Sequence, residues 1–88
     1  MERTPLERVV DRLMVDCEVV AGKRRRPMRR ADLARKLGIG WSALCRTLAA
    51  RNPHLESLRN IAEGLGVTGA GLLRLVEDEE RRQKESSN

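Results

Sequence analysis

The sequence is poor in aromatic and catalytic side chains. It has no Phe and no Tyr, and Trp41 is its only aromatic residue, so its core must be built from aliphatic side chains. Its only histidine, His54, stands beside Pro53 without a second histidine or a pair of acidic residues to form a catalytic group. We therefore expect a protein that is not an enzyme.

Cysteines and long apolar runs are also scarce. Cys17 and Cys45 fit neither a metal-binding spacing nor a disulfide-rich pattern, and we expect them to be reduced, buried small hydrophobes. There is no apolar run of the roughly 18 residues that a membrane span needs, and the N-terminal sequence MERTPLER lacks a signal-peptide profile. We expect a cytoplasmic protein with no cofactor, no metal and no membrane partner.

The basic residues are concentrated in one part of the chain. With 88 residues the chain is long enough for one small domain, which we expect at residues 1–82, followed by a flexible tail at 83–88. The net charge is +5, and one short segment supplies six of the 18 basic residues: Lys23, Arg24, Arg25, Arg26, Arg29 and Arg30. Such a cluster indicates a polyanionic partner or a solvated loop.

Apolar spacing and end signals predict five helices and no strands. Thr4 and Pro5 are typical of a helix start, and an apolar face continues from there to Ala21, where Gly22 ends the helix. A basic loop at residues 23–27 follows. The second helix is expected at residues 29–37, and the third at 41–50.

Two further helices are expected in the C-terminal half. Asn52 is the predicted cap of the fourth helix, with Pro53 at its first position and Leu55 beginning its buried face. Gly66 ends that helix. Thr68 is the predicted cap of a fifth helix that runs to about residue 82.

The second and third helices are separated by only three residues, Gly38-Ile39-Gly40. Two helices joined by so short a turn must cross at a large angle. This geometry holds a second helix out for insertion into the major groove of DNA. The pattern predicts a helix-turn-helix.

With these elements placed, the chain resembles the Cro/C1-type (lambda repressor-like, XRE) helix-turn-helix family. The stretch DLARKLGI at residues 32–39 is similar to the family's second helix and turn, and NPHLESL at 52–58 to the start of its fourth. The resemblance covers roughly residues 6–76 and implies an all-α, five-helix lambda repressor-like DNA-binding domain. The chain departs from the family at Arg29-Arg30, where Thr-Gln is common, at the Gly40 cap, and at Leu48, where Glu is frequent.

The resemblance implies which residues meet DNA. The base-facing positions at the start of the third helix are Trp41, Ser42 and Arg46. Arg46 suits bidentate contact with guanine, while Trp41 either packs on the DNA or lies against the second helix. The resemblance also implies contacts to the DNA backbone from Arg29, Arg30, Arg51 and Asn52. We expect further contacts of this kind from the basic cluster that leads directly into the helix-turn-helix: Lys23, Arg24, Arg25 and Arg26.

These residues together predict a sequence-specific transcriptional regulator, a repressor that binds double-stranded DNA as a homodimer on a two-fold operator. The expected dimer interface is the apolar strip of the fifth helix, formed by Leu72, Leu75 and Val76. One alternative is an antitoxin or restriction-modification controller of the same fold, which also binds a toxin or another protein. A second is a protein-interaction module that does not bind DNA.

Overall fold

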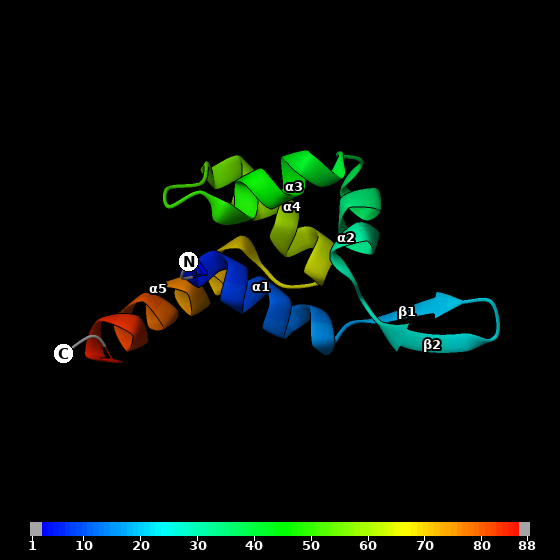
Figure 1. Cartoon of the computed structure of the whole chain (residues 1–88), viewed down its shortest axis with the longest axis horizontal. Helices are drawn as coiled ribbons and strands as arrows, with labels where there is room; N and C mark the ends of the chain where they lie inside the picture. Colours follow the sequence, from blue (N-terminus) through cyan, green and yellow to red (C-terminus); the bar gives the residue numbers. More distant parts are fainter. Residues whose placement is uncertain (1–2, 87–88) are drawn as a thin grey trace.

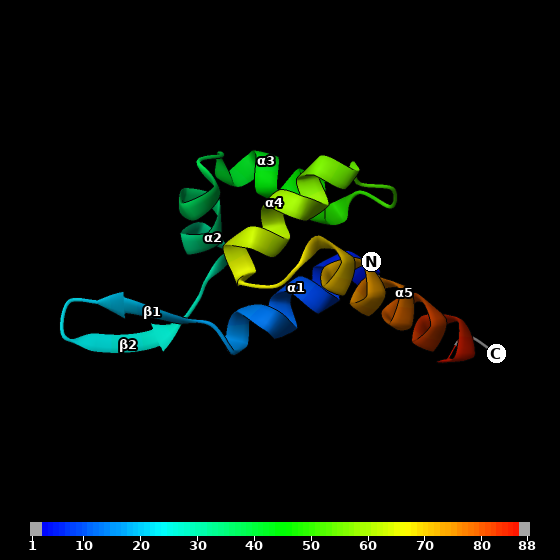
Figure 2. The same ribbon diagram turned by 180° about the vertical axis from the view of Figure 1, so that it is seen from behind.

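In the computed structural model, residues 3–86 are described and form five helices and one two-stranded hairpin. The elements are α1 (Pro5–Val15), β1 (Glu18–Ala21), β2 (Arg24–Pro27), α2 (Arg30–Leu37), α3 (Trp41–Ala49), α4 (Leu55–Leu65) and α5 (Gly69–Ser86). Figure 1 shows α2, α3 and α4 on one side of the molecule, with α1 and α5 on the other. The hairpin projects from the end opposite to the C-terminal end of α5, as the view from behind also shows (Figure 2).

The ends of several helices are fixed by local signals. The Thr4 hydroxyl accepts a hydrogen bond of 3.1 Å from the Glu7 amide and caps α1. The Thr68 hydroxyl accepts one of 2.9 Å from the Gly71 amide at the start of α5. Both caps confirm the sequence prediction. They satisfy amides that have no partner within the helix.

The core is aliphatic and draws on all five helices. Its fully enclosed side chains include Val10, Leu33, Leu44, Leu48, Ile61 and Leu72. Each helix contributes through residues spaced three or four apart, which is the spacing that places side chains on one helical face. Cys17 and Cys45 are free thiols and only half-buried, so neither is the fully buried hydrophobe that we expected.

A glycine controls the distance between α2 and α4. Gly64 is buried within α4, and a Cβ atom placed on it would lie 3.0 Å from Cδ1 of Leu33 and 3.1 Å from Cδ2 of Leu37. Leu33 is fully enclosed and has little room to move. Gly64 therefore weakens α4 as an isolated helix but permits the close packing of α2 on it.

The hairpin is a correction to the prediction that the first helix reaches Ala21 and leads into a basic loop. Helix α1 ends at Val15, and β1 then pairs antiparallel with β2, with Val19 opposite Arg26 and Val20 opposite Arg25. Val19 and Val20 are β-branched and favour strands. Gly22, with φ of 66°, is the first residue of a two-residue turn, where a positive φ matches the twist of a hairpin.

Two smaller corrections concern the C-terminal half. Helix α4 begins at Leu55 with His54 as its cap, since the first helical hydrogen bond joins the Leu58 amide to the His54 carbonyl. Leu55 is consequently exposed rather than part of the buried face. Helix α5 continues to Ser86, so most of the predicted tail is helical, and residues 87–88 lie outside the described part. None of the described helices is both long enough and apolar enough to cross a bilayer.

The packing at Gly64 yields a stability prediction. Replacing Gly64 by Ala improves helix propensity by about 1 kcal/mol, but overpacking of an enclosed contact costs about 1–3 kcal/mol. We expect Gly64→Ala to lower the free energy of unfolding by about 1 kcal/mol, as measured by chemical denaturation followed by circular dichroism. Asn60→Ala, at an exposed position in the same helix, is the control and is expected to raise it by about 0.5 kcal/mol. A stabilised Gly64→Ala variant would contradict this account of the α2–α4 contact.

Candidate nucleic-acid interface

The turn between α2 and α3 is closed by its own backbone. Gly38 ends α2 in the left-handed conformation, with φ of 70°. The Gly38 amide donates to the Arg35 carbonyl at 3.2 Å, and the Ile39 amide donates to the Ala34 carbonyl at 3.0 Å. This pair of bonds is the usual way in which glycine ends a helix. Gly40 is the N-cap of α3, which begins at Trp41, so only three residues separate the two helices.

Helix α3 has one buried and one exposed face. Leu44 and Leu48 are fully enclosed in the core. Trp41 is 54 % exposed, which excludes a place in the core, and Ser42 and Arg46 are exposed as well. Trp41 and Ser42 lie in the first turn of α3 and Arg46 in its last, so an aromatic ring, a hydroxyl and a guanidinium are presented to solvent along the helix.

The start of α3 carries amides that no side chain caps. Gly40 has no side chain to accept their hydrogen bonds, as its place in the sequence predicted. The N-terminal end of a helix has a partial positive charge and attracts anionic groups. The Arg46 side chain, by contrast, belongs to the last turn of α3 and takes part in no ion pair or hydrogen bond with residues 3–86. The uncapped amides leave the start of α3 electropositive, and the Arg46 guanidinium is open to a ligand at its last turn.

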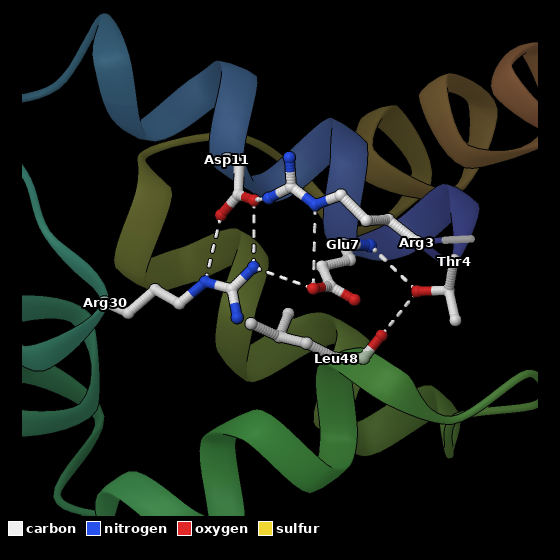
Figure 3. Close-up of polar contacts among 6 residues, drawn as sticks. All are labelled: Arg3, Thr4, Glu7, Asp11, Arg30 and Leu48. Atoms are coloured by element: carbon white, nitrogen blue, oxygen red, sulfur yellow. Dashed lines mark hydrogen bonds and ion pairs between the residues drawn. The ribbon is translucent and has the colours of Figure 1, made fainter. Parts of the chain in front are cut away.

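Arg30 lies in a network of ion pairs between α1 and α2 (Figure 3). Its guanidinium donates to both carboxylate oxygens of Asp11, at 3.1 and 2.9 Å, and to Glu7 at 3.0 Å. Arg3 approaches the same two carboxylates. Only 22 % of the Arg30 side chain is exposed. The sequence placed Arg30 on the DNA backbone, but its donors face α1, because two carboxylates one helical turn apart hold it there.

A second arginine of the basic cluster is also held by a carboxylate. Arg26 donates two hydrogen bonds to Asp32, at 2.6 and 2.8 Å, in the bidentate geometry that suits a guanidinium and a carboxylate. These bonds, with a further one from the Arg29 amide, hold the pKa of the Asp32 carboxyl well below its usual range. Arg26 therefore joins β2 to the first turn of α2 and is not among the freely exposed cations.

The other residues that were predicted to contact the DNA backbone are exposed. They are Lys23, Arg24, Arg25, Arg29, Arg51 and Asn52. Arg25 makes a long 3.4 Å contact with Glu18, and both of those side chains are well exposed, so the pair restrains it little. The structure adds Arg35 and Lys36, which are exposed on α2 and line a shallow groove beside β1. The sequence could have indicated their exposure, because neither residue lies on the apolar face of the α2 sequence RADLARKL.

The three residues of α5 that were predicted to form the dimer interface differ in their exposure. Leu72 is fully enclosed in the core of its own chain, so its assignment to an interface was wrong. Val76 is half-buried and packs against the same core. Leu75 is 40 % exposed and lies beside Leu13 of α1 in a small groove between the two helices. The neighbouring Leu73 is exposed to a similar extent, although the sequence did not single it out.

Comparisons of the chain with models of known families, with curated proteins and with solved structures found no match. Helix α3 is the element among residues 3–86 that combines an exposed aromatic ring, an exposed hydroxyl and a guanidinium without an acidic partner.

The two adjacent arginines at the start of α2 should differ in their effect on stability. Arg30→Gln leaves Asp11 and Glu7 with Arg3 as their only cation, and Arg3 is the more exposed of the two arginines. We expect a loss of about 1–2 kcal/mol in the free energy of unfolding. Arg29→Gln is the matched control, since Arg29 is exposed, and its effect should stay within about 0.5 kcal/mol. Chemical denaturation of the three proteins under the same conditions measures both values. Equal effects would show that the network contributes nothing specific to stability.

Proposed function

We propose that this chain is a sequence-specific DNA-binding transcriptional regulator of the lambda repressor-like, Cro/C1 type. The observation that carries the proposal is the orientation of α3, whose leucines are enclosed while Trp41, Ser42 and Arg46 are exposed together. A helix held by one face, with hydrogen-bonding groups on its exposed face, has the form that a major groove accepts.

In this proposal α2 and α3 form a helix-turn-helix, and α3 is the recognition helix. Arg46 donates two hydrogen bonds to O6 and N7 of a guanine, a pairing that no other base can reproduce in the major groove. Ser42 donates to or accepts from a neighbouring base edge. Trp41 places its ring against thymine methyl groups or sugars.

Phosphate contacts position the recognition helix. We assign them to exposed cations near α3 that lack a close carboxylate partner, with Arg29 before α2 and Arg51 after α3 on either side of the unit. Asn52 adds a neutral hydrogen-bond donor. Arg26 and Arg30 are left out, because their donors are directed to Asp32 and to the carboxylates of α1. The net charge of +5 favours association with a polyanion at long range.

The proposed regulator is a homodimer that binds a two-fold operator. One recognition helix reads only a few base pairs, and two linked copies supply the affinity and selectivity that a genome requires. Leu75 and Leu73 leave apolar surface on α5 for a second copy to cover. We infer repression, because a dimer that occupies promoter DNA excludes the polymerase from it by occupancy alone.

The experiment that tests the proposal is selection of duplexes from a random pool, followed by binding measurements with an Arg46→Ala variant. We expect a two-fold sequence to be enriched by the wild type. Arg46→Ala should lose about 1–3 kcal/mol of binding free energy on that sequence and relax the preference at one base pair in each half-site.

Arg8→Ala is the matched control, because Arg8 is equally an exposed arginine but lies on α1. Its selected sequence should equal that of the wild type. Failure of the wild type to enrich any sequence would overturn the proposed function. Unchanged selectivity in the Arg46 variant would overturn the assignment of α3 as the reading helix.

Dimerisation is expected to depend on Leu75. Leu75→Glu places a charge in the proposed interface, and we expect a folded monomer by analytical ultracentrifugation and circular dichroism. Its affinity for the selected duplex should fall by about a hundredfold, because the two half-sites are no longer read by linked subunits. Leu55→Glu, which adds the same charge at an exposed leucine of α4, should leave the sedimentation of the dimer unchanged. A dimeric Leu75→Glu protein would place the interface on another surface.

A further inference from the structure

The β1–β2 hairpin has no evident role in holding the helices together. The core cluster is built from the five helices, and each strand has its main contacts with the other strand. Figures 1 and 2 show the hairpin standing away from the helical body. A hairpin of two strands is marginal in water unless something packs against it. Val20 of β1 is 69 % exposed, so its side chain is not covered by the helices.

The base of the hairpin is fixed to α2. Arg26 is joined to Asp32 through two hydrogen bonds, and the Met28 amide donates to the Cys17 carbonyl at 2.8 Å, which extends the pairing of the strands toward the helices. Because Asp32 lies in the first turn of α2, the hairpin is mounted directly on the proposed helix-turn-helix. It is therefore a positioned projection of that unit.

The outer part of the hairpin is strongly basic. Lys23 lies in the turn and Arg24 begins β2, and both are exposed and make no ion pair within residues 3–86. Side chains alternate between the faces of a strand, so Arg24 lies on the same face as Arg26, which is turned toward α2. Arg35 and Lys36 line the groove between α2 and β1 on that side. The same groove also holds Glu18 and Asp32, and Asp32 is paired with Arg26. Exposed positive charge is thus placed at the tip of the hairpin and on α2.

We propose that the hairpin is a DNA-binding arm, which contacts the sugar-phosphate backbone outside the base pairs read by α3. The inference rests on the proposed function and extends it to the flanks of the operator. The molecule is 47 Å long, with the hairpin at one end and the C-terminal part of α5 at the other (Figure 1). In the proposed dimer through α5, we assign the two arms to the sides away from the two-fold axis, at the outer end of each half-site.

The charge of the arm favours DNA over a second copy of the chain as its partner. Edge-to-edge pairing of two hairpins would bring two copies of the segment Lys23, Arg24, Arg25 and Arg26 together, and like charges repel in such pairs. A phosphate backbone offers the opposite charge at regular intervals, and its contacts require no particular base sequence. The arm is therefore expected to add affinity without adding selectivity.

The test compares two double variants that each remove two exposed positive charges. Lys23→Gln/Arg24→Gln changes the arm, and Arg8→Gln/Lys84→Gln changes α1 and α5. The probes are the duplex enriched by the wild type, trimmed to its selected base pairs, and the same duplex extended at each end by about one helical turn of arbitrary sequence. Two unrelated flanking sequences are used. Affinity is measured by fluorescence anisotropy, and backbone contacts by hydroxyl-radical footprinting.

We expect the wild type and the α1/α5 variant to bind the extended duplexes at least about tenfold more tightly than the trimmed one, whichever flank is present. The arm variant should bind both lengths equally and lose the footprint on the flanks. The proposal of a DNA-binding arm would be overturned if the arm variant also bound the extended duplexes more tightly, or if the wild type did not. Either result would leave the proposed function intact. If the arm variant instead changes the oligomeric state, the hairpin is a protein interface and the proposal is wrong. If no duplex is bound at all, both proposals fall.

Discussion

The orientation of α3, and so the surface that it exposes, depends on contacts that α1 makes with α2 and α3. Asp11 and Glu7 lie one turn apart on α1 and bind Arg30 at the start of α2. At the beginning of α1 the Thr4 hydroxyl donates a 2.5 Å hydrogen bond to the Leu48 carbonyl near the end of α3. Figure 3 shows these contacts along one side of α1. A single helix therefore fixes the entry to α2 and the exit from α3, and with them the angle between the two.

The ion pairs of Arg30 with Asp11 and Glu7 contribute to stability because they are partly buried. Fully exposed ion pairs contribute little, because water and salt screen them and the side chains must be ordered. The Arg30, Asp11 and Glu7 side chains are each about one-fifth exposed, and the guanidinium makes three hydrogen bonds that match its planar geometry. The aliphatic core supplies most of the stability, while these directional contacts select one arrangement of helices that an all-aliphatic core would specify less sharply.

The sequence was informative where the signal was local. The caps at Thr4 and Thr68, and the glycine that ends α2, depend on residues within one turn of each other, and these were predicted correctly. The hairpin was missed because Cys17 and Val20 continue the helical spacing of α1, so the β-branched pair and the turn at Gly22 were interpreted as the end of a helix. A periodic pattern cannot distinguish these outcomes when the segment is short.

Contacts between distant residues were beyond the reach of such patterns. Arg30 and Asp11 are 19 positions apart, and nothing in either neighbourhood marks them as partners. The apolar strip of α5 contains both enclosed Leu72 and exposed Leu75, and the extent to which each is covered depends on how α5 rests on α1 and α4. The exposed residues of α3 were easier to identify, because Leu44 and Leu48 fix its buried face within the helix itself.

The basic cluster between Lys23 and Arg30 combines two roles that composition alone does not separate. Arg26 and Arg30 are held by carboxylates and serve the fold, since each links α2 to a neighbouring element. Lys23, Arg24 and Arg29 are exposed and have no acidic partner among residues 3–86. An arginine whose donors are already directed to carboxylates offers little to a phosphate, because binding would first have to break those bonds. Fewer positive charges are therefore available for recognition than the sequence suggests. The elements that carry them are held in place in part by the ion pairs of Arg26 and Arg30.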